Sequence, residues 1–563
     1  MKQNVFTNPL KIIQAFEIKD VLPAFREVQE EINKGFYAAG FIAYEASPAF
    51  NSSLKVKEGY TGPLLWFAVF HSRSATICSA EDRPYRIGDW LPDTKANEYK
   101  QAFEMIKDEI KLGNTYQVNY TFRLRSEFSG DAFAFYKQLK RSQQAGYSAY
   151  LDIGKMKILS ASPELFFRLK GDKLITKPMK GTVKRGKTVK EDENFNKWLQ
   201  QSAKNQAENV MIVDLLRNDL NLAAQNGSIA VDQLFEIEKY PTVWQMTSTI
   251  QAKVGNGTSL IDIFKALFPC GSITGAPKIS TSEIISRTER SPRGVYCGAI
   301  GFITPDNEAI FNVPIRTVTI DTAAGEMEYG TGGGVTWDSE LKGEYDEAFL
   351  KAKLLGESHP DFQLLESFKL ENGKYEWFEH HLIRLQESAD YFDFPYDGQE
   401  IKTALKEYAD HYGKGIAKVR LTLARCGSLT ISDSPLLLDG RKYTIKLAEE
   451  AIDQENPFLY HKTTNRKVYE QLRKAHPGYD EVLLWNQHEE LTEFTNGNLV
   501  VKLNGKLYTP PVESGLLAGT FRKELLITKS IEERKILKSD LPYIEKIWFI
   551  NSVRGWVEGQ LCE

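Results

Sequence analysis

The sequence has few cysteines for its length, and none of them stands in a CxxC pair. Its 563 residues contain five: Cys78, Cys270, Cys297, Cys426 and Cys562. Structural zinc sites and dithiol motifs need closely spaced cysteines, and a disulfide framework needs a paired set. This scattered, odd-numbered set argues against all three and favours a reducing compartment.

The sequence also lacks a long apolar run and an excess of charge of either sign. No stretch of about 18 apolar residues occurs, so we expect no transmembrane helix, and the N-terminus has no signal-peptide pattern. The 71 Lys and Arg nearly balance the 75 Asp and Glu, for a formal net charge of −4. We therefore expect a soluble cytoplasmic protein that binds neither membranes nor nucleic acid.

The best candidate for a domain boundary is the sequence GESHPD at residues 356–361. It combines Gly, Ser, Pro and charge, and it follows a strongly helical run that ends at Leu355. The residues after it alternate like a hairpin around Asn372-Gly373. We expect one domain over residues 1–355, a linker over 356–361 and a second domain over 362–563.

The first part mixes short strands and helices without strict alternation, which favours an α+β sandwich of sheets. The expected elements are strands at 147–151, 157–160, 164–169 and 173–176, a single long helix at 194–216, and paired strands at 295–303 and 309–320.

Three carboxylates of the first part could hold a metal ion. Glu208 lies on one predicted helix, and Glu344 and Glu347, three residues apart, share a face of another. Hard oxygen ligands of this kind suit Mg²⁺. By spacing alone, the same residues could instead be a solvated helix face.

Three other features each allow two interpretations when taken alone. The run from Gly330 to Gly334, GTGGG, could present backbone N–H groups to an anion or form a turn with positive φ. Arg316, after Val-Pro-Ile, suits either a bound carboxylate or a structural ion pair. Lys180, in PMKGT, could be a nucleophile of lowered pKa or an exposed lysine of a basic loop.

Together, the motifs of the first part resemble those of the chorismate-utilising enzymes, over roughly residues 35–355. The family fold is a two-sheet β-sandwich flanked by helices, and its substrate chorismate is a dicarboxylate held by Mg²⁺. The motifs, in the family's order, are YQVN from Tyr116, SPE from Ser162, PMKGT from Pro178, AEN and MIVDLLRNDL from Ala207, GAPK from Gly275, YCGAIG from Tyr296, IRT from Ile315 and EYDE from Glu344.

Two positions identify the branch of the family that the chain resembles. Gln117 stands where the water-adding branches have a lysine base, which favours ammonia as the nucleophile. Lys180 stands where anthranilate synthases have alanine and aminodeoxychorismate synthases have lysine. The resemblance implies that Lys180 attacks ring C2, that Glu164 is the general acid and base, and that ammonia then adds at C4.

The resemblance also assigns binding roles. Glu208, Glu344 and Glu347 would carry Mg²⁺, directly or through water. The substrate would be bound by Tyr296, Arg316, Lys351, Gly332, Gly334, Thr182, Ser272 and Thr274, with the amides near Gly332 to Gly334 helping to hold its carboxylates.

Asn205 and Gln245 depart from the acidic residue and the histidine that many members have at these positions, which leaves the surroundings of the metal and of the leaving group open. No cysteine stands in a nucleophile-elbow context. Ammonia would therefore come from solution or from a separate glutaminase subunit.

In the second part, Lys462, Glu493 and Arg384 would each be unremarkable alone, as an exposed lysine, a turn carboxylate and a solvated arginine. Their motifs together resemble the class IV fold that uses pyridoxal phosphate, over about residues 362–563. The motifs are HLIRL from His381, KVRLTL from Lys418, HKTTNR from His461, TEFTNGN from Thr492, SGLLAGTFR from Ser514 and NSVRG from Asn551.

By this resemblance, Lys462 binds the cofactor covalently and Glu493 pairs with its pyridine nitrogen. Arg384 and the amides of Thr520 and Phe521 would bind its phosphate, with help from Ser552. A threonine common in aminotransferases is absent at Phe521, which favours the lyase branch.

The fusion implies an aminodeoxychorismate synthase followed by an aminodeoxychorismate lyase, which together make 4-aminobenzoate. Two alternatives remain at this stage: an anthranilate-type enzyme joined to an aminotransferase, and a C-terminal module that only docks a partner. Because the class IV fold often dimerises, we also expect a homodimer through the second part.

Overall fold

The computed structural model describes residues 4–75, 83–255, 257–356, 361–436 and 440–562. The chain divides into two compact units: Met1–Arg185 with Phe195–His359, and Gly186–Asn194 with Pro360–Glu563. Most of the expected linker, residues 357–360, lies outside the described residues, as does Cys78. Each unit is described below by itself.

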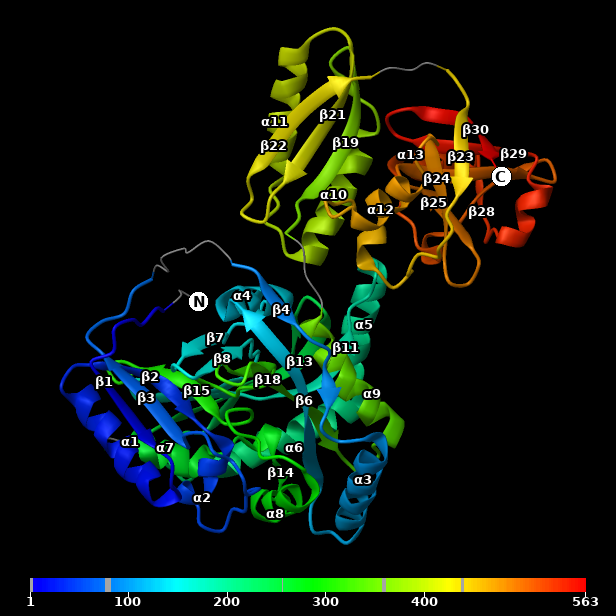
Figure 1. Cartoon of the computed structure of the whole chain (residues 1–563). Helices are drawn as coiled ribbons and strands as arrows, with labels where there is room; N and C mark the ends of the chain where they lie inside the picture. The colour runs from blue at the N-terminus through cyan, green and yellow to red at the C-terminus, as the bar shows by residue number, and fades with distance from the viewer. Residues whose placement is uncertain (1–3, 76–82, 256, 357–360, 437–439, 563) are drawn as a thin grey trace. The chain divides into compact units, whose positions relative to one another are not determined.

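The first sheet of the first unit has ten strands, in the order β1-β3-β2-β15-β16-β9-β10-β13-β11, with β12 paired to β13 (Figure 1). Its strands are β1 (Lys11–Ala15), β2 (Tyr37–Ile42), β3 (Leu65–Phe70), β9 (Leu165–Lys170), β10 (Lys173–Lys177), β11 (Met179–Lys184), β12 (Ala230–Lys239), β13 (Val243–Lys253), β15 (Ala299–Ile303) and β16 (Ala309–Asn312).

The second sheet of this unit has eight strands, in the order β14-β6-β18-β17-β8-β7, with β4 and β5 paired to β6. Its strands are β4 (Tyr85–Ile87), β5 (Leu91–Pro92), β6 (Gln117–Gly130), β7 (Ala149–Asp152), β8 (Met156–Ser160), β14 (Gly275–Ala276), β17 (Thr317–Asp321) and β18 (Glu326–Val335).

Helices accompany both sheets of the first unit, so the predicted α+β class is confirmed. They are α1 (Ile18–Asn33), α2 (Ser47–Phe50), α3 (Ala96–Lys111), α4 (Ala132–Gln143), α6 (Ala203–Leu220), α7 (Leu260–Leu267), α8 (Lys278–Thr288) and α9 (Leu341–Ala352); α5 (Val189–Gln201) crosses the division between the units.

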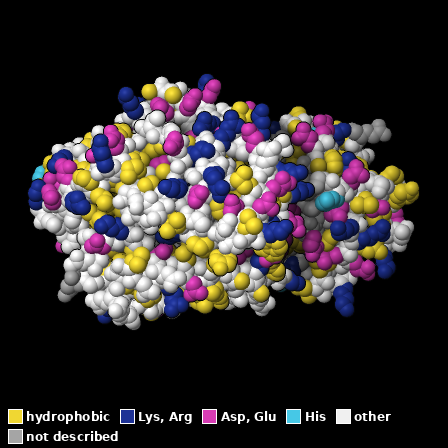
Figure 2. Space-filling model, turned by 90° about the horizontal axis from the view of Figure 1, so that it is seen from below, with side chains coloured by type: hydrophobic (Ala, Val, Ile, Leu, Met, Phe, Trp, Pro, Cys, Tyr) yellow, Lys and Arg dark blue, Asp and Glu magenta, His cyan; other side chains and the backbone are white. Residues whose placement is uncertain are grey.

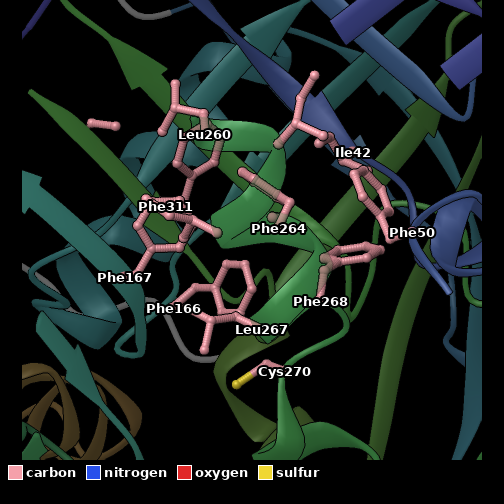
Figure 3. Close-up of a cluster of buried hydrophobic side chains, with 14 of the residues drawn as sticks. Ile42, Phe50, Phe166, Phe167, Leu260, Phe264, Leu267, Phe268, Cys270 and Phe311 are labelled. Atoms are coloured by element: carbon pink, nitrogen blue, oxygen red, sulfur yellow. The ribbon is translucent and has the colours of Figure 1, made fainter. Parts of the chain in front are cut away.

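The core of the first sheet gathers around α7, where phenylalanines from distant parts of the chain meet (Figure 3). Phe264 is fully buried, and its ring lies 5.1 Å from that of Phe25, 5.3 Å from Phe167 and 5.1 Å from Phe311, edge to face in each case. Such contacts add to the apolar area that each ring buries. This cluster ties α7 to β9 and β16, whose neighbouring segments carry candidate site residues.

Replacing Phe264 with alanine should destabilise the first unit by about 3–5 kcal/mol, because it leaves a cavity among rings that cannot collapse into it. Calorimetric unfolding should show a lower transition temperature for this unit only. Ile279→Ala, at a position 49% exposed, is the control and should change stability by less than about 0.5 kcal/mol. An unchanged transition in Phe264→Ala would contradict this placement of the core.

Two expectations for local structure were wrong, and one of two alternatives left open for Gly330–Gly334 is excluded. The expected single helix at 194–216 is two helices, α5 and α6. Ser202 separates them and caps α6 by accepting a hydrogen bond from the Asn205 amide. The expected strand at 309–320 is β16 and β17, which lie in different sheets. Gly330–Gly334 is not a turn but part of β18, paired with β6 along its length.

The expected strands at 147–151, 157–160, 164–169 and 173–176 correspond to β7, β8, β9 and β10, within one or two residues at each end. The pairing expected at 295–303 is also present, between β15 and β16.

The second unit has a four-stranded sheet, in the order β20-β19-β21-β22, with α10 and α11 packed against it. The expected hairpin is confirmed, since Asn372 and Gly373, at φ 50° and 77°, join β19 to β20. The elements are β19 (Leu364–Glu371), β20 (Lys374–Tyr375), α10 (Phe378–Phe392), α11 (Gly398–Tyr412), β21 (Ile416–Leu423) and β22 (Leu429–Pro435).

This unit also has a mixed eight-stranded sheet, in the order β25-β24-β23-β30-β29-β26-β27-β28, in which β23 runs parallel to β24 and β30. The elements are β23 (Tyr443–Leu447), α12 (Lys467–Ala475), β24 (Glu481–Trp485), β25 (Leu491–Phe494), β26 (Gly497–Leu503), β27 (Lys506–Thr509), α13 (Thr520–Ile527), β28 (Glu532–Glu533), β29 (Lys546–Asn551) and β30 (Gly555–Cys562).

The surface carries charge of both signs. In Figure 2, Lys and Arg side chains alternate with Asp and Glu over the visible face, with hydrophobic side chains scattered between them. Among the described residues, no helix is both long and apolar enough to cross a membrane.

Candidate active sites

The glycines of β18 mark the centre of the candidate site in the first unit. A Cβ atom at Gly334 would lie 2.1 Å from Gln117 Nε2 and 3.0 Å from Lys180 Nζ. A Cβ at Gly333 would lie 2.8 Å from Glu344 Oε2 and 3.9 Å from Lys351 Nζ. The run is therefore free of side chains where polar groups from three other elements, β6, β11 and α9, converge on it.

The glycine run also keeps one backbone edge open. Strand β6 pairs with all of β18, whereas β17 pairs with it only from Glu326 to Tyr329. Among the described residues, no strand covers the other edge of Gly330–Gly334. This edge has no strand partner in the described part of the chain although Gly330 to Gly333 are buried, which suits the predicted role of amides near Gly332 and Gly334 in binding an anion.

Lys180 and Glu164 lie close enough to interact electrostatically. Burial lowers the pKa of Lys180, an effect that Glu208 and Glu164 partly oppose. Burial raises the pKa of Glu164 to about 7, although Ser272 and Lys180 both favour its ionised form. Ser272 Oγ donates a hydrogen bond to Glu164 Oε1 at 2.6 Å. The pair thus has the amine and carboxylic acid characters that a nucleophile and a general acid need.

The three predicted metal ligands lie near one another without forming a compact cluster. Burial, and to a smaller extent the charge of Glu347, raises the pKa values of Glu208 and Glu344. Glu344 Oε1 accepts a hydrogen bond from Ser339 at 2.7 Å, and Glu347 pairs with Lys351 at 2.7 Å. Among the described residues, no three His, Cys, Asp or Glu side chains are placed to ligate one metal.

The donor set nevertheless fits Mg²⁺ in its chemistry. It is all oxygen, and the negative charge of Glu347 raises the pKa values of Glu208 and Glu344, a repulsion that a divalent cation would relieve. Lys351 supplies part of that positive charge through its ion pair with Glu347. Its Nζ also donates to Gly332 O at 3.0 Å.

Two residues that depart from the family pattern support the strand of Lys180. Gln245 Nε2 donates to Gly181 O at 2.8 Å, and its Oε1 accepts from Thr182 Oγ1 at 2.9 Å. A Cβ at Gly181 would lie 3.1 Å from Asn205 Oδ1. Gln245 and Asn205 therefore pack against the two residues that follow Lys180, and Thr182 uses its hydroxyl within the protein.

The other predicted substrate-binding residues are less central. Thr274 Oγ1 donates to Cys270 O at 2.8 Å. Tyr296 packs against Gly330, with the buried Arg123 guanidinium 5.0 Å from its ring centre. Arg316 donates to Gln143 and, among the described residues, forms no ion pair with a carboxylate. A half-buried arginine in this state is suited to a carboxylate ligand.

The candidate site of the second unit is a cavity of about 470 Å³ that contains Lys462 and Glu493. Burial, and then the charge of Arg384, lowers the pKa of Lys462 to about 7, so a substantial fraction of its amine is neutral near that pH. Arg384, Thr520 and Ser552 also line the cavity, as predicted from their motifs. Phe521 packs its ring 4.8 Å from that of Trp377, which leaves only its backbone for a ligand.

Glu366 is a residue of this site that sequence reasoning missed. Its carboxylate accepts hydrogen bonds from Arg384 Nε at 2.9 Å and Nη2 at 2.7 Å. It also lies 2.6 Å from His381 Nδ1, and His381 Nε2 lies 3.2 Å from Thr520 Oγ1. Burial alone would raise the pKa of Glu366, but Arg384 and His381 lower it to about 2. This buried charge network fixes Arg384 beside the first turn of α13.

Glu493 is buried, and burial raises its pKa to about 8. Tyr469 donates to its Oε1 at 2.8 Å, and Asn498 donates to its Oε2 at 3.3 Å. Among the described residues, no cationic side chain forms an ion pair with it within 4.0 Å. A buried carboxyl group in this state fits a protonated pyridine nitrogen, and together with Lys462 it makes the cavity suitable for pyridoxal phosphate.

Comparisons with known proteins agree with both sites. The model of the chorismate binding enzyme family matches residues 71–357. The chain belongs to that family. The model of class IV aminotransferases matches residues 363–561, so both resemblances drawn from the motifs are confirmed.

Two curated relatives each match about half of this chain. Aminodeoxychorismate synthase component 1 of Bacillus subtilis is 39% identical over 276 residues, which are 49% of this chain and 58% of the relative. Anthranilate synthase component 1 of Aquifex aeolicus is 31% identical over 283 residues, 50% of this chain and 57% of the relative. The chain thus spans less than two thirds of the length of these relatives.

A solved structure supports the fold of the first unit. The anthranilate synthase component I of Streptococcus pneumoniae aligns with a TM-score of 0.56 and 23% identity, over 63% of this chain and 92% of the other. At this identity the likeness concerns the fold alone.

Proposed function

We propose that the chain makes 4-aminobenzoate from chorismate in two steps, one in each unit. The observation that carries the proposal is the pair of half-buried lysines of lowered pKa, Lys180 within electrostatic reach of Glu164 in the first unit and Lys462 in the lining of the cavity of the second. The likeness to aminodeoxychorismate synthases, which is greater than that to the anthranilate synthase, supports the first step.

In the first step, the neutral amine of Lys180 forms a bond to ring C2 as the C4–O bond breaks. Glu164 gives the departing hydroxyl its proton, so that water leaves. Ammonia then adds at C4, and the C2–N bond to Lys180 breaks, which yields 4-amino-4-deoxychorismate. Glu208, Glu344 and Glu347 would hold Mg²⁺, which neutralises a carboxylate of the substrate. Arg316, Lys351 and the open edge near Gly332 would orient the carboxylates.

In the second step, the chain removes pyruvate from this product. Pyridoxal phosphate, when bound, supplies the electron sink for the elimination. Arg384 and the first amides of α13 would bind its phosphate, and Glu493 would pair with its pyridine nitrogen. Lys462 takes the proton from ring C4, and the bond from C3 to the pyruvate oxygen breaks as the ring becomes aromatic.

Ammonia is a substrate of the proposed first step, and a separate glutaminase subunit is its proposed source. A homodimer through the second unit stays a prediction, as does the domain division at residues 356–361.

Lys180 can be tested directly as a covalent nucleophile. The protein should be mixed with chorismate and Mg²⁺ without ammonia, quenched in acid and digested. We expect the peptide that contains Lys180 to gain the mass of chorismate less one water. No adduct there, under conditions in which added ammonium gives product, would contradict the covalent step.

The first step should depend on the protonation of Glu164. Because the acid must carry a proton and its pKa is about 7, kcat/KM for amination should fall as pH rises through about 7. Glu164→Gln should be slow at every pH and should lose this fall. A wild-type rate that climbs steadily from pH 6 to pH 9 would show that Glu164 is not the acid.

A further inference from the structure

A loop between two helices of the first unit carries Ser272, the hydrogen-bond donor to Glu164. The loop spans residues 268–277, between the end of α7 and the start of α8, and we call it the Ser272 loop. Arg293 Nη1 holds its middle by donating to Ile273 O at 2.7 Å. Because Ser272 Oγ donates to Glu164 Oε1 at 2.6 Å, the place of this loop decides whether that contact forms.

Lys278 closes the Ser272 loop at its base. It is the first residue of α8, and its Nζ donates at 2.8 Å to the carbonyl of Leu267, the last residue of α7. The last carbonyls of a helix have no partner within the helix, so a lysine there is favourable. The stem of the side chain runs beside the loop, since a Cβ at Gly271 would lie 3.9 Å from Lys278 Cε. One side chain thus joins both ends of the loop and passes the residue before Ser272.

An ion pair fixes Lys278 in this place. Its Nζ lies 2.8 Å from Oδ2 of Asp219, in the last turn of α6, and the two side chains are 12% and 14% exposed. Burial raises the pKa of Asp219, and the charge of Lys278 opposes that rise. Because both charges lose water, a pair this deeply buried contributes little net stability, and fixing local geometry is the role that it suits.

We propose that Lys278 is a positioning residue for the first step, which closes the Ser272 loop and so keeps Ser272 hydrogen-bonded to Glu164. This inference rests on the proposed function, in which Glu164 is the acid, and adds a residue that acts through Ser272. The hydrogen bond favours the ionised form of Glu164, so its loss raises the pKa of that carboxyl group. Variants that loosen the loop should therefore keep the acid protonated to higher pH.

Among the described residues, the other titratable groups that act on Glu164 are Lys180 on β11 and Cys270 in the Ser272 loop (Figure 3). Burial raises the pKa of the Cys270 thiol to about 12, and the charge of Lys278 opposes that rise, so the thiol stays neutral with or without Lys278. Lys180 is kept in every variant. A shifted pH profile then reports the contact between Ser272 and Glu164.

The test compares Lys278→Met with the wild type, as full chains, in the amination of chorismate. The fall of kcat/KM with pH should move upward by about one pH unit, the effect of one hydrogen bond to a carboxylate. Below the fall, kcat should drop by about tenfold while KM changes less than about threefold. Ser272→Ala should move the fall equally, and Ser272→Ala/Lys278→Met no further than Ser272→Ala alone.

Arg287→Met is the matched control, because it removes an ion pair at the other end of α8, with Glu109 at 2.8 Å. It should leave the pH profile and kcat unchanged. Lys278→Arg keeps a cation with donors for both oxygens and should restore most of kcat. If Lys278→Met fails to fold because Asp219 is left unpaired, Lys278→Met/Asp219→Asn removes both charges and takes its place.

Hydrogen exchange gives a readout that does not require turnover. The amides of residues 268–277 should exchange at least about tenfold faster in Lys278→Met than in the wild type or Arg287→Met, while those of α7 keep their rates. Faster exchange spread over the whole first unit would show a role in stability alone and would overturn the proposal.

The outcomes separate this role from the proposed function. If the wild type aminates chorismate, an unshifted profile in Lys278→Met, or shifts that add in Ser272→Ala/Lys278→Met, would overturn the positioning role and leave the function standing. A wild type that makes no 4-amino-4-deoxychorismate would reject the function, and the exchange rates would then decide whether Lys278 holds the loop.

Discussion

Replacing Lys180 with alanine should abolish the amination of chorismate by the first unit. The substitution removes the group that bonds to ring C2 in the proposed first step, so the rate should fall by at least about 10³-fold. The measurement is the amount of 4-amino-4-deoxychorismate formed from chorismate, Mg²⁺ and an ammonium salt. Release of pyruvate from supplied 4-amino-4-deoxychorismate should be unaffected, because Lys180 and Lys462 lie in different units.

The control for this substitution is Lys184→Ala, at an exposed position on the same strand. It changes charge and strand composition in the same way but removes no group of the proposed chemistry. Full activity in the Lys180→Ala protein would mean that ammonia attacks the ring without a covalent step. A switch of product to 2-aminobenzoate would mean that Lys180 directs where the amine is added.

Replacing Lys462 with alanine should block the second step and leave the first intact. The rate of pyruvate release should fall by at least about 10³-fold, because in the proposed second step Lys462 both holds the cofactor and moves the proton at ring C4. We expect 4-amino-4-deoxychorismate to accumulate in place of 4-aminobenzoate when the variant is given chorismate and ammonium. Product analysis by mass spectrometry distinguishes the two.

Lys467→Ala is the matched control, since Lys467 is an exposed lysine in the first turn of α12. It should release pyruvate at the wild-type rate. If Lys462→Ala also kept that rate, the second unit would not be the lyase, and the reading of this unit as a docking module would gain support.

The sequence could predict those site residues that stand in motifs, because both the order and the chemistry of the motifs are visible in it. Ser272 lies more than 90 residues after Glu164 and Lys180 in the sequence, yet the structure brings the three into one network. Each of these residues is open to a plain structural role when taken alone, and the order of the motifs along the chain made them informative. Lys462 and Glu493 were predictable in the same way.

Residues that act through another residue were not predictable. Glu366 lies in a strand that reads as ordinary alternation, and only the fold shows that it fixes Arg384 and His381. Tyr469 looks like a helix residue that packs in the core, and only its 2.8 Å hydrogen bond links it to Glu493. Neither residue type carries a local signal for such a role.

Local sequence patterns were a poor guide to structure in two regions of the first unit. Glycine-rich Gly330–Gly334 suggested a turn, but β6 supplies a partner for the whole run, so long-range pairing overrides local propensity. The run 194–216 has a continuous helical pattern, and a single serine at position 202 breaks it by capping. In the first region the deciding contact comes from a distant strand, and in the second it comes from one residue within the pattern.

The most direct test of the account is the identity of the aromatic product. The wild-type protein should be incubated with chorismate, Mg²⁺, pyridoxal phosphate and ¹⁵N-ammonium, and the products separated and identified by mass and retention. The account predicts 4-aminobenzoate that carries one ¹⁵N, with an equal amount of pyruvate. Labelled 2-aminobenzoate as the product would contradict it.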